Sequence, residues 1–159
     1  MDKREPTGKN ETLQLEYNPD EALRLDHQLC FKLYAASKEV VRLYKPVLDE
    51  LDLTYTQYSA MLVLWEAGEL SVRELGERLM LDSGTLSPLL KKLEAKGWIN
   101  RRRSAADERV IVLGLTPHGR ALKTQAAHVP LTVGGCIPLE PHEAIQLAGL
   151  LDKLLTGLA

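Results

Sequence analysis

Two capping boxes that lie close together in the chain constrain its fold more than any other sequence feature. In Thr54–Gln57, and again in Ser71–Glu74, a hydroxyl residue is followed three residues later by Gln or Glu. This pattern marks the start of a helix, because the two side chains satisfy backbone N–H groups that have no partner within the helix. An apolar run follows the first box and ends before Gly68, a residue type that commonly terminates helices. The sequence therefore predicts two short helices joined by a tight turn.

A third helix and a hairpin are predicted directly after this pair. Asp82 and Ser83 are candidate N-caps, and Gly97 is placed to stop a helix that runs to about the residue before it. Residues 98–103 and 109–113 are predicted strands, joined by a short polar tip. The expected order of helix, turn, helix and hairpin is that of a winged helix-turn-helix. The leucines of the third helix fall at i, i+3, i+4 and i+7, which gives it one buried face: Leu86, Leu89, Leu90 and Leu93.

Helical patterns flank this central part, and the first lies before it. Residues 1–19 are polar and are expected to form a flexible arm. From Asp20 a long helical pattern begins, in which apolar residues recur about every 3.6 residues as far as Leu48. Pro46 should kink this helix or end its first section near Tyr44, because proline lacks the N–H that a helix interior needs.

The second flanking part follows the hairpin. Thr116 followed by Pro117 marks a helix start. The prolines and glycines of residues 130–138 predict an irregular break, and an amphipathic helix follows Pro141. Amphipathic terminal helices on so small a lobe leave apolar faces that a second copy would cover. We therefore expect a mainly α fold with a small β-hairpin wing, in which the N- and C-terminal helices form a dimerisation region.

Length and composition exclude several classes of protein. A chain of 159 residues with 45% apolar and 26% charged residues is typical of one globular domain. The first eleven residues have no apolar core, so they are not a secretory signal. The longest apolar stretch, Ala60–Trp65, is too short to cross a bilayer. We therefore expect a soluble, cytoplasmic protein that does not enter a membrane.

Charge is distributed unevenly along the chain. Residues 1–70 carry 8 basic and 13 acidic side chains, whereas residues 71–120 carry 10 basic and 6 acidic ones. A basic segment in an acidic chain favours contact with a polyanion, and the alternative is an ordinary solvated face. Together with the winged-helix order it indicates double-stranded DNA as a partner, because the major groove of B-DNA admits a helix.

The residues that we expect to contact DNA lie on the third helix and on the hairpin. Short hydroxyls can reach base edges or phosphates, and lysines can neutralise phosphates. An arginine near a hairpin tip suits the narrow minor groove, and Asp107 could hold the Arg109 guanidinium by a paired hydrogen bond. The alternative is a solvated hairpin with ordinary surface arginines. The candidates are Ser83, Thr85, Ser87, Pro88, Lys91, Lys92, Arg101, Arg102, Arg103, Asp107 and Arg109.

Two cysteines, Cys30 and Cys136, form a second constellation. A permanent disulfide is not expected in the cytosol, which leaves inert buried thiols, metal ligands or a redox pair. Neither cysteine has a Cys or His partner that completes a metal-binding spacing, so no metal and no other cofactor is expected.

Tyr34 follows Cys30 at i+4, whereas Tyr44 is ~21 Å along the helix axis and could meet only the Cys30 of a partner subunit. Tyr55 could converge on the same place, and phenolic O–H donors would stabilise a thiolate.

The run LDSGTLSPLLKKLE, followed by GWINRRR and DER, resembles the multiple antibiotic resistance regulator (MarR) family. Within that family the string DSGTLSPLLK is similar to the organic hydroperoxide resistance regulators, and the likeness covers about Leu25–Leu158. The resemblance implies an obligate homodimer, held by its first and last helices, that binds a pseudo-palindromic operator. It also implies one domain over residues 20–159, made of dimerisation helices in 20–53 and 116–159 and a DNA-binding lobe in 54–115.

The resemblance further implies roles for the cysteines and tyrosines. Cys30 matches the reactive cysteine, and Tyr44 and Tyr55, joined by Tyr34, match its hydrogen-bonding tyrosines. Cys136 would be the resolving cysteine of the two-cysteine subgroup, and an intersubunit disulfide would release the DNA. The implied function is a repressor that senses organic hydroperoxides and is not an enzyme. The alternatives are a repressor of the same fold that is released by a phenolic or aromatic ligand, and a thiol peroxidase.

Overall fold

The computed structural model describes residues 18–158, and the chain divides into two compact units, Met1–Glu39 and Val40–Ala159. Helix α2 (Leu29–Asp49) contains the boundary between them. Apart from its last two residues, the arm predicted for residues 1–19 lies outside the described residues. In the described part of the chain, no helix combines the length and the apolar character needed to cross a membrane.

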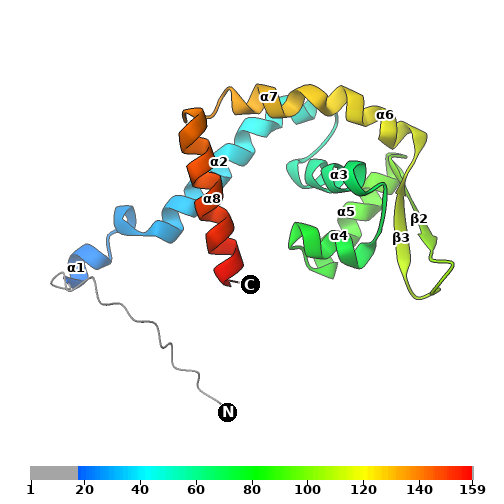
Figure 1. The fold of residues 1–159 in the computed structure, drawn as a ribbon, viewed down its shortest axis with the longest axis horizontal. Helices are drawn as coiled ribbons and strands as arrows, with labels where there is room; N and C mark the ends of the chain where they lie inside the picture. The colour runs from blue at the N-terminus through cyan, green and yellow to red at the C-terminus, as the bar shows by residue number, and fades with distance from the viewer. Residues whose placement is uncertain (1–17, 159) are drawn as a thin grey trace, which may run out of the picture. The chain divides into compact units, whose positions relative to one another are not determined.

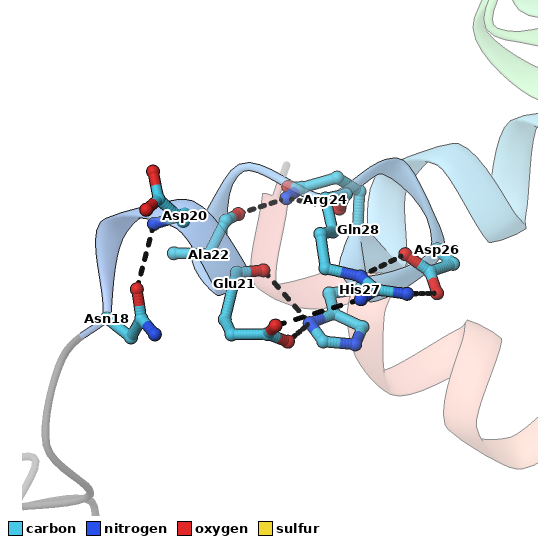
Figure 2. A network of polar contacts seen from close by, with 8 residues as sticks. All are labelled: Asn18, Asp20, Glu21, Ala22, Arg24, Asp26, His27 and Gln28. Carbon is cyan, nitrogen blue, oxygen red and sulfur yellow. Dashed lines mark hydrogen bonds and ion pairs between the residues drawn. The ribbon is translucent and has the colours of Figure 1, made fainter.

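The described part of the first unit contains a broken helix, so the single long helix predicted from the apolar spacing is wrong here. Helix α1 (Pro19–Ala22), the 3-10 turn η1 (Leu25–His27) and α2 are separated at Arg24 and Gln28, whose ψ angles of 134° and 111° are extended. A polar network stabilises the break (Figure 2), in which the Gln28 amide donates to the carbonyls of Ala22 at 2.5 Å and Arg24 at 3.2 Å. The side-chain amide of Gln28 thus takes the place of backbone donors that a continuous helix would supply. The spacing of apolar residues does not reveal such a break.

Charged side chains close the same turn. The Arg24 guanidinium donates to both carboxylate oxygens of Asp26, from Nε at 3.1 Å and from Nη2 at 2.9 Å, and holds the pKa of Asp26 below its usual value. Nδ1 of His27 lies 2.9 Å from the carbonyl oxygen of Glu21 (Figure 2). These contacts order the backbone immediately before Cys30, the second residue of α2.

The second unit contains the predicted helix, turn, helix and hairpin. Both capping boxes form, because the hydroxyl of Thr54 accepts from the Gln57 N–H at 3.3 Å and that of Ser71 accepts from the Glu74 N–H at 3.1 Å. Gly68 ends the first of these helices with φ 75°. The elements after α2 are α3 (Tyr55–Ala67), β1 (Glu69–Ser71), α4 (Val72–Leu79), α5 (Ser83–Ala95), β2 (Ile99–Arg103), β3 (Ile111–Leu115), α6 (Pro117–Gln125), η2 (Ala126–His128), α7 (Val129–Gly134) and α8 (Pro141–Leu158).

The wing is a three-stranded antiparallel sheet in the order β1-β3-β2. The predicted hairpin of β2 and β3 is confirmed, with Ile99 opposite Leu115. Strand β1 was not predicted, because its three residues are too few to show an alternating pattern, and it joins the sheet through Leu70 opposite Leu113. Figure 1 shows α3, α4 and α5 grouped beside this sheet, in contact with its strands.

The core of the second unit is organised around α5. The fully buried Met61 and Leu64 of α3, Leu75 of α4 and Leu113 of β3 belong to the same cluster as the α5 leucines. One face of α5 is therefore held in the core, and the opposite face is presented to solvent. All four leucines that were predicted to face inward are buried: Leu86, Leu89, Leu90 and Leu93.

Two prolines interrupt the helices less than the sequence predicts. Helix α2 continues through Pro46 into a last turn in which Leu48 is only 1% exposed. Burial of this leucine offsets the hydrogen bond that proline cannot donate. Pro130 lies in the first turn of α7, where a missing N–H removes no helical bond. The irregular break predicted for residues 130–138 therefore begins only at Gly135, the C-cap of α7.

Helix α6 approaches the chain before β2 very closely at Gly119. A Cβ at this position would lie 1.9 Å from the carbonyl oxygen of Trp98, so a side chain cannot be placed there without moving backbone. The Gly119 carbonyl also accepts a hydrogen bond from the indole N–H of Trp65 at 2.8 Å. Gly119 thus joins α3, α6 and the start of the wing.

Replacing Gly119 by Ala should lower the free energy of unfolding by about 1–3 kcal/mol, because the added methyl group overpacks this contact. Gly134→Ala is the matched control, since that position in α7 faces open space and Ala favours a helix over Gly by up to about 1 kcal/mol. Urea unfolding followed by tryptophan fluorescence measures both variants. Equal stability of the two proteins would contradict the close approach.

Candidate functional site

Helix α5 presents the face that the sequence assigns to DNA. Its N-cap is Asp82, whose carboxylate accepts from the N–H of Thr85 at 2.9 Å and from its hydroxyl at 3.0 Å; these hydrogen bonds lower the pKa of Asp82. An ionised carboxylate also suits the positive end of the helix dipole. Whether this face contacts DNA stays a prediction. Its candidates are all exposed: Ser83, Thr85, Ser87, Pro88, Lys91 and Lys92.

Two of the three arginines at the base of the wing are engaged by carboxylates of neighbouring elements. Arg101 donates from Nε at 2.8 Å, and also from Nη2, to Oε2 of Glu94 on α5. Arg102 donates from Nη2 to Oε2 of Glu69 on β1 at 2.6 Å. These pairs connect β2 to α5 and to β1. They also pair two cations that the sequence assigns to DNA binding with carboxylates of this chain.

Hydrogen bonds within the wing tip order its backbone. The N–H of Ser104 donates to the carbonyl of Val110 at 2.8 Å, and the N–H of Val110 donates to the carbonyl of Asp107 at 3.0 Å. Nη1 of Arg103 donates to the carbonyl of Glu108 at 3.1 Å. The third arginine of the run therefore supports the tip that follows it.

Arg109 is held differently from the way the sequence suggests. Oδ1 of Asp107 accepts from the backbone N–H of Arg109 at 3.0 Å, whereas the guanidinium Nε lies 3.9 Å away and the side chain is 96% exposed. The predicted paired hydrogen bond is therefore wrong. The carboxylate stabilises the turn backbone instead, as Asp commonly does in turns, and the guanidinium extends into solvent.

A groove with a volume of about 820 Å³ lies between α4, α5 and the wing. Apolar side chains that include Leu86 and Ile111 line it together with Arg73, Arg101 and Arg109. A groove of this kind can accept a small aromatic anion, because the ring contacts apolar surface while the guanidinium groups contact its charge.

Cys30 and Cys136 are free thiols, and both are exposed. Cys30 lies in the first turn of α2, as its second residue. Cys136 follows the C-cap of α7, where its thiol lies 3.4 Å from the carbonyl oxygen of Thr132. Because one cysteine belongs to the first unit and the other to the second, their pairing stays a prediction.

Three tyrosines gather where α2 meets α3. The rings of Tyr44 and Tyr55 have centroids 4.9 Å apart at an angle of 64°, and the ring of Tyr58 lies 6.0 Å from that of Tyr44. The structure thus brings together two of the three predicted tyrosines. Tyr34, in the first unit, is 64% exposed. The contact of these phenols with Cys30 stays a prediction.

Two of these phenols have a raised pKa, and burial is the largest cause. It raises the pKa of Tyr44, and the neighbouring Tyr55 raises it further. Burial also raises the pKa of Tyr58, with added contributions from Tyr44 and Tyr55. Because the ordinary pKa of tyrosine is about 10, both groups remain hydrogen-bond donors well above neutral pH.

The sequence analysis did not identify three residues that contact the candidate site residues: Tyr58 in the tyrosine cluster, and Glu69 and Glu94 beside the arginines of β2. Tyr58 stands at i+3 from Tyr55, a spacing that places both on one helix face and could have been recognised. Glu69 and Glu94 precede their arginine partners by 33 and 7 residues across a change of element, so no periodicity relates them. Among the residues that the structure describes, no group of three or more His, Cys, Asp or Glu side chains could hold a metal ion.

Comparison with known proteins identifies the relatives of this chain. Residues 42–126 match the family described as transcriptional regulator SarA/Rot. The organic hydroperoxide resistance transcriptional regulator of Bacillus subtilis is 45% identical over 141 residues, which are 89% of this chain and 96% of that protein. The chain belongs to the MarR family of winged-helix transcription regulators.

Solved structures of AbfR of Staphylococcus epidermidis share the fold of this MarR regulator. Reduced AbfR bound to DNA aligns with a TM-score of 0.73 and 34% identity, over 87% of this chain and 94% of AbfR. Disulfide-formed AbfR aligns with a TM-score of 0.59 and 33% identity, over 87% of this chain and 92% of AbfR. The predicted mainly α fold with a winged helix-turn-helix is therefore confirmed.

Replacing Glu94 by Gln in this MarR regulator should release Arg101 for a phosphate. One more phosphate contact steepens the log–log salt dependence of DNA binding by about 0.9 and tightens binding at low salt. Fluorescence anisotropy with a labelled duplex of unselected sequence, titrated over a range of KCl concentrations, measures the slope. Asp49→Asn is the control, because it removes a carboxylate paired with Lys45 on α2 at 2.7 Å. A Glu94→Gln slope equal to that of the wild type would show that Glu94 does not restrain Arg101.

The raised pKa values of Tyr44 and Tyr58 predict a late phase in an alkaline titration of tyrosine absorbance. Tyr58→Phe should remove part of this phase. A folded-state pKa above the unfolded value contributes stability that is complete below about pH 10 and is lost as the pH rises through the folded pKa. The decline in the free energy of unfolding above about pH 10 should therefore be smaller in Tyr58→Phe than in the wild type. Unchanged titration and stability curves in the variant would rule out this assignment.

Proposed function

We propose that this MarR regulator is a homodimeric repressor that binds a pseudo-palindromic operator and senses organic hydroperoxides through Cys30. One observation carries the proposal: an exposed thiol stands in the first turn of α2, in a chain 45% identical to an organic hydroperoxide resistance regulator. The AbfR structures, described as reduced with DNA and as disulfide-formed, support redox control of DNA binding. The proposal includes a cytoplasmic location, because a repressor acts where the DNA is.

Dimerisation would cover apolar surface that a single chain leaves exposed. On α8, Ile145 is 73% exposed and Leu150 is 66% exposed. Large apolar side chains gathered on one exposed helix are typical of an interface. We assign dimerisation to residues 20–53 and 116–159, and DNA binding to the lobe of residues 54–115.

Two such lobes would read successive major grooves on one side of the DNA, with an α5 helix in each groove. Lys91 and Lys92 would neutralise phosphates, Thr85 would reach base edges from the N-terminal part of the helix, and Arg109 would enter the minor groove. With three or four phosphates neutralised by each lobe, the log–log salt slope would be about −5 to −7.

The sensing chemistry is a two-electron oxidation of sulfur by the peroxide. The Cys30 thiolate attacks the terminal oxygen of the hydroperoxide, the O–O bond breaks, and the alkoxide leaves and takes up a proton to become an alcohol. The thiol of Cys136 then attacks the resulting sulfenic acid, so that a disulfide forms and water leaves. The phenol of Tyr44, whose pKa burial raises, and that of Tyr55 would donate hydrogen bonds to the thiolate.

Release of the operator needs only a modest change in binding free energy. A hundredfold loss of affinity corresponds to about 2.7 kcal/mol. A disulfide between subunits would change the spacing of the two lobes, and both lobes must fit the same DNA for tight binding. The reaction ends at the disulfide, so the protein consumes one peroxide for each disulfide and does not act as an enzyme.

Two cysteine variants test this function. Cys30→Ser should bind DNA with wild-type affinity yet remain bound after cumene hydroperoxide, whereas wild-type affinity should fall by about a hundredfold. Cys136→Ser should lose the covalent dimer that the oxidised wild type forms. The measurements are non-reducing electrophoresis, and anisotropy with a duplex selected from a random-sequence pool by the reduced protein.

The same variants separate the alternatives. Normal release of Cys30→Ser by cumene hydroperoxide would overturn the redox proposal. Release of the wild type by an aromatic carboxylate, abolished by substitution of Arg73 in the groove described above, would favour the ligand-controlled repressor. Continuous consumption of hydroperoxide in the presence of added thiol would favour a thiol peroxidase.

A further inference from the structure

One polar contact joins the turn after α2 to the end of the recognition helix α5. Lys96 is the C-cap of α5. Its ammonium donates to the carbonyl oxygen of Asp52 and lies 2.8 Å from the Oδ2 atom of the same residue. The ammonium also lies 4.7 Å from the centre of the Trp98 ring, within the range of a cation–π interaction. A single lysine thus connects the α2–α3 turn, the end of α5 and the start of the wing.

The geometry of this contact differs from that of an ordinary surface ion pair. The side chain of Lys96 is 27% exposed, whereas that of Asp52 is 84% exposed, so the lysine is largely covered while its partner projects from the turn. Most ion pairs between long exposed side chains have little directional preference. Here a backbone carbonyl, a carboxylate and an aromatic ring fix the position of one ammonium.

The contact also depends on an unusual backbone conformation. Asp52 has φ 56°, in the left-handed region that residues other than glycine seldom adopt. The N–H of Leu53 donates to the carbonyl of Leu48 at 2.9 Å, which closes the turn behind α2. Because Lys96 holds the Asp52 carbonyl as well as its carboxylate, a change in the turn conformation would displace the lysine.

The turn lies between the two elements that carry the clustered tyrosines. Helix α2 ends three residues before Asp52, and α3 begins three residues after it at Tyr55. The rings of Tyr44 and Tyr55 are in contact, with centroids 4.9 Å apart. A change in the packing of these rings therefore moves the two ends of the turn relative to each other.

The apolar core beneath the turn connects the same elements, but apolar contact is not directional. Leu48, Leu53 and Leu93 belong to one buried cluster, which holds the turn and the end of α5 together without a directional bond. A hydrogen-bonded ammonium, in contrast, loses its acceptors when they are displaced. The contact of Lys96 with Asp52 is thus suited to carry a displacement from the turn to α5.

We propose that Lys96 is a positioning residue that couples the tyrosine cluster to the recognition helix through the turn at Asp52. The inference rests on the proposed function, in which oxidation of Cys30 acts at these tyrosines. When their packing changes, the turn moves, Lys96 moves with it, and the end of α5 shifts relative to the DNA.

The test compares Lys96→Met, which keeps most of the stem and removes the ammonium, with Lys96→Arg, which restores a cation. The readout is the ratio of the dissociation constants for a selected duplex after and before cumene hydroperoxide. In Lys96→Met this ratio should fall about tenfold below that of the wild type, with the affinity of the reduced protein largely kept. Lys96→Arg should restore most of the ratio. Lys45→Met, which breaks the exposed pair with Asp49 on α2, is the control and should keep the wild-type ratio.

A second variant separates a loss of coupling from a loss of stability. Asp52→Asn removes the carboxylate but retains a residue type that tolerates the left-handed region, together with its carbonyl and the Lys96–Trp98 contact. In Asp52→Asn the ratio of dissociation constants after and before cumene hydroperoxide should fall, as in Lys96→Met. The thermal unfolding midpoint of the variant should equal that of the wild type.

The outcomes distinguish this inference from the proposed function. A wild-type protein that stays on DNA after oxidation overturns the proposed function and this coupling with it. A wild-type protein that is released, together with Lys96→Met and Asp52→Asn proteins that are released equally well, overturns the coupling alone. A lower ratio in Lys45→Met equal to that in Lys96→Met would also overturn it, because the effect would then not be specific to the turn.

Discussion

The burial of one leucine face of α5 is the constraint on which the proposed DNA-binding surface depends. Leu86, Leu90 and Leu93 are at most 3% exposed, so the rotation of the helix about its axis is fixed by packing. Once that rotation is set, the hydroxyls and lysines between the leucines face solvent. The same core holds the strand that follows, because Trp98 and Ile99 are buried where the chain leaves the helix. The position of the wing relative to α5 thus follows mainly from apolar packing. The ion pairs of Arg101 and Arg102 add polar contacts between elements that are already packed together.

Residues 71–120 combine an excess of basic side chains with ion pairs between neighbouring elements. Arg101 and Arg102 contact Glu94 and Glu69, yet these side chains are partly exposed, and exposed ion pairs contribute little stability. The pairs hold both guanidinium groups beside carboxylates of neighbouring elements. Under the proposed function, Glu94 and Glu69 thus compete with phosphates for Arg101 and Arg102, so that removal of either carboxylate would free one more cation for the DNA.

Features that local signals encode could be predicted from the sequence, and features that depend on distant parts of the chain could not. The capping boxes at Thr54 and Ser71 and the leucine spacing of α5 involve residues within one or two helical turns, and the structure contains them. The break before α2 depends on the Gln28 side chain reaching back six residues, and β1 is defined only by pairing with a strand more than forty residues away. The Glu94–Arg101 pair likewise arises only after the fold brings the two elements together. The proposed pairing of the cysteines would depend on the arrangement of the two units and of two subunits, which no local pattern specifies.

The hydrogen bonds inside the wing tip have a thermodynamic consequence for association. Ordering a loop backbone costs about 1–2 kcal/mol per residue in conformational entropy. Because Ser104, Asp107 and Val110 are already tied to one another in the free chain, that loss is incurred during folding. Under the proposed function, in which the tip enters a minor groove, only the Arg109 side chain would remain to be immobilised, at a cost of no more than about 2 kcal/mol. Electrostatic attraction rather than loop ordering would then govern the contribution of the tip to affinity.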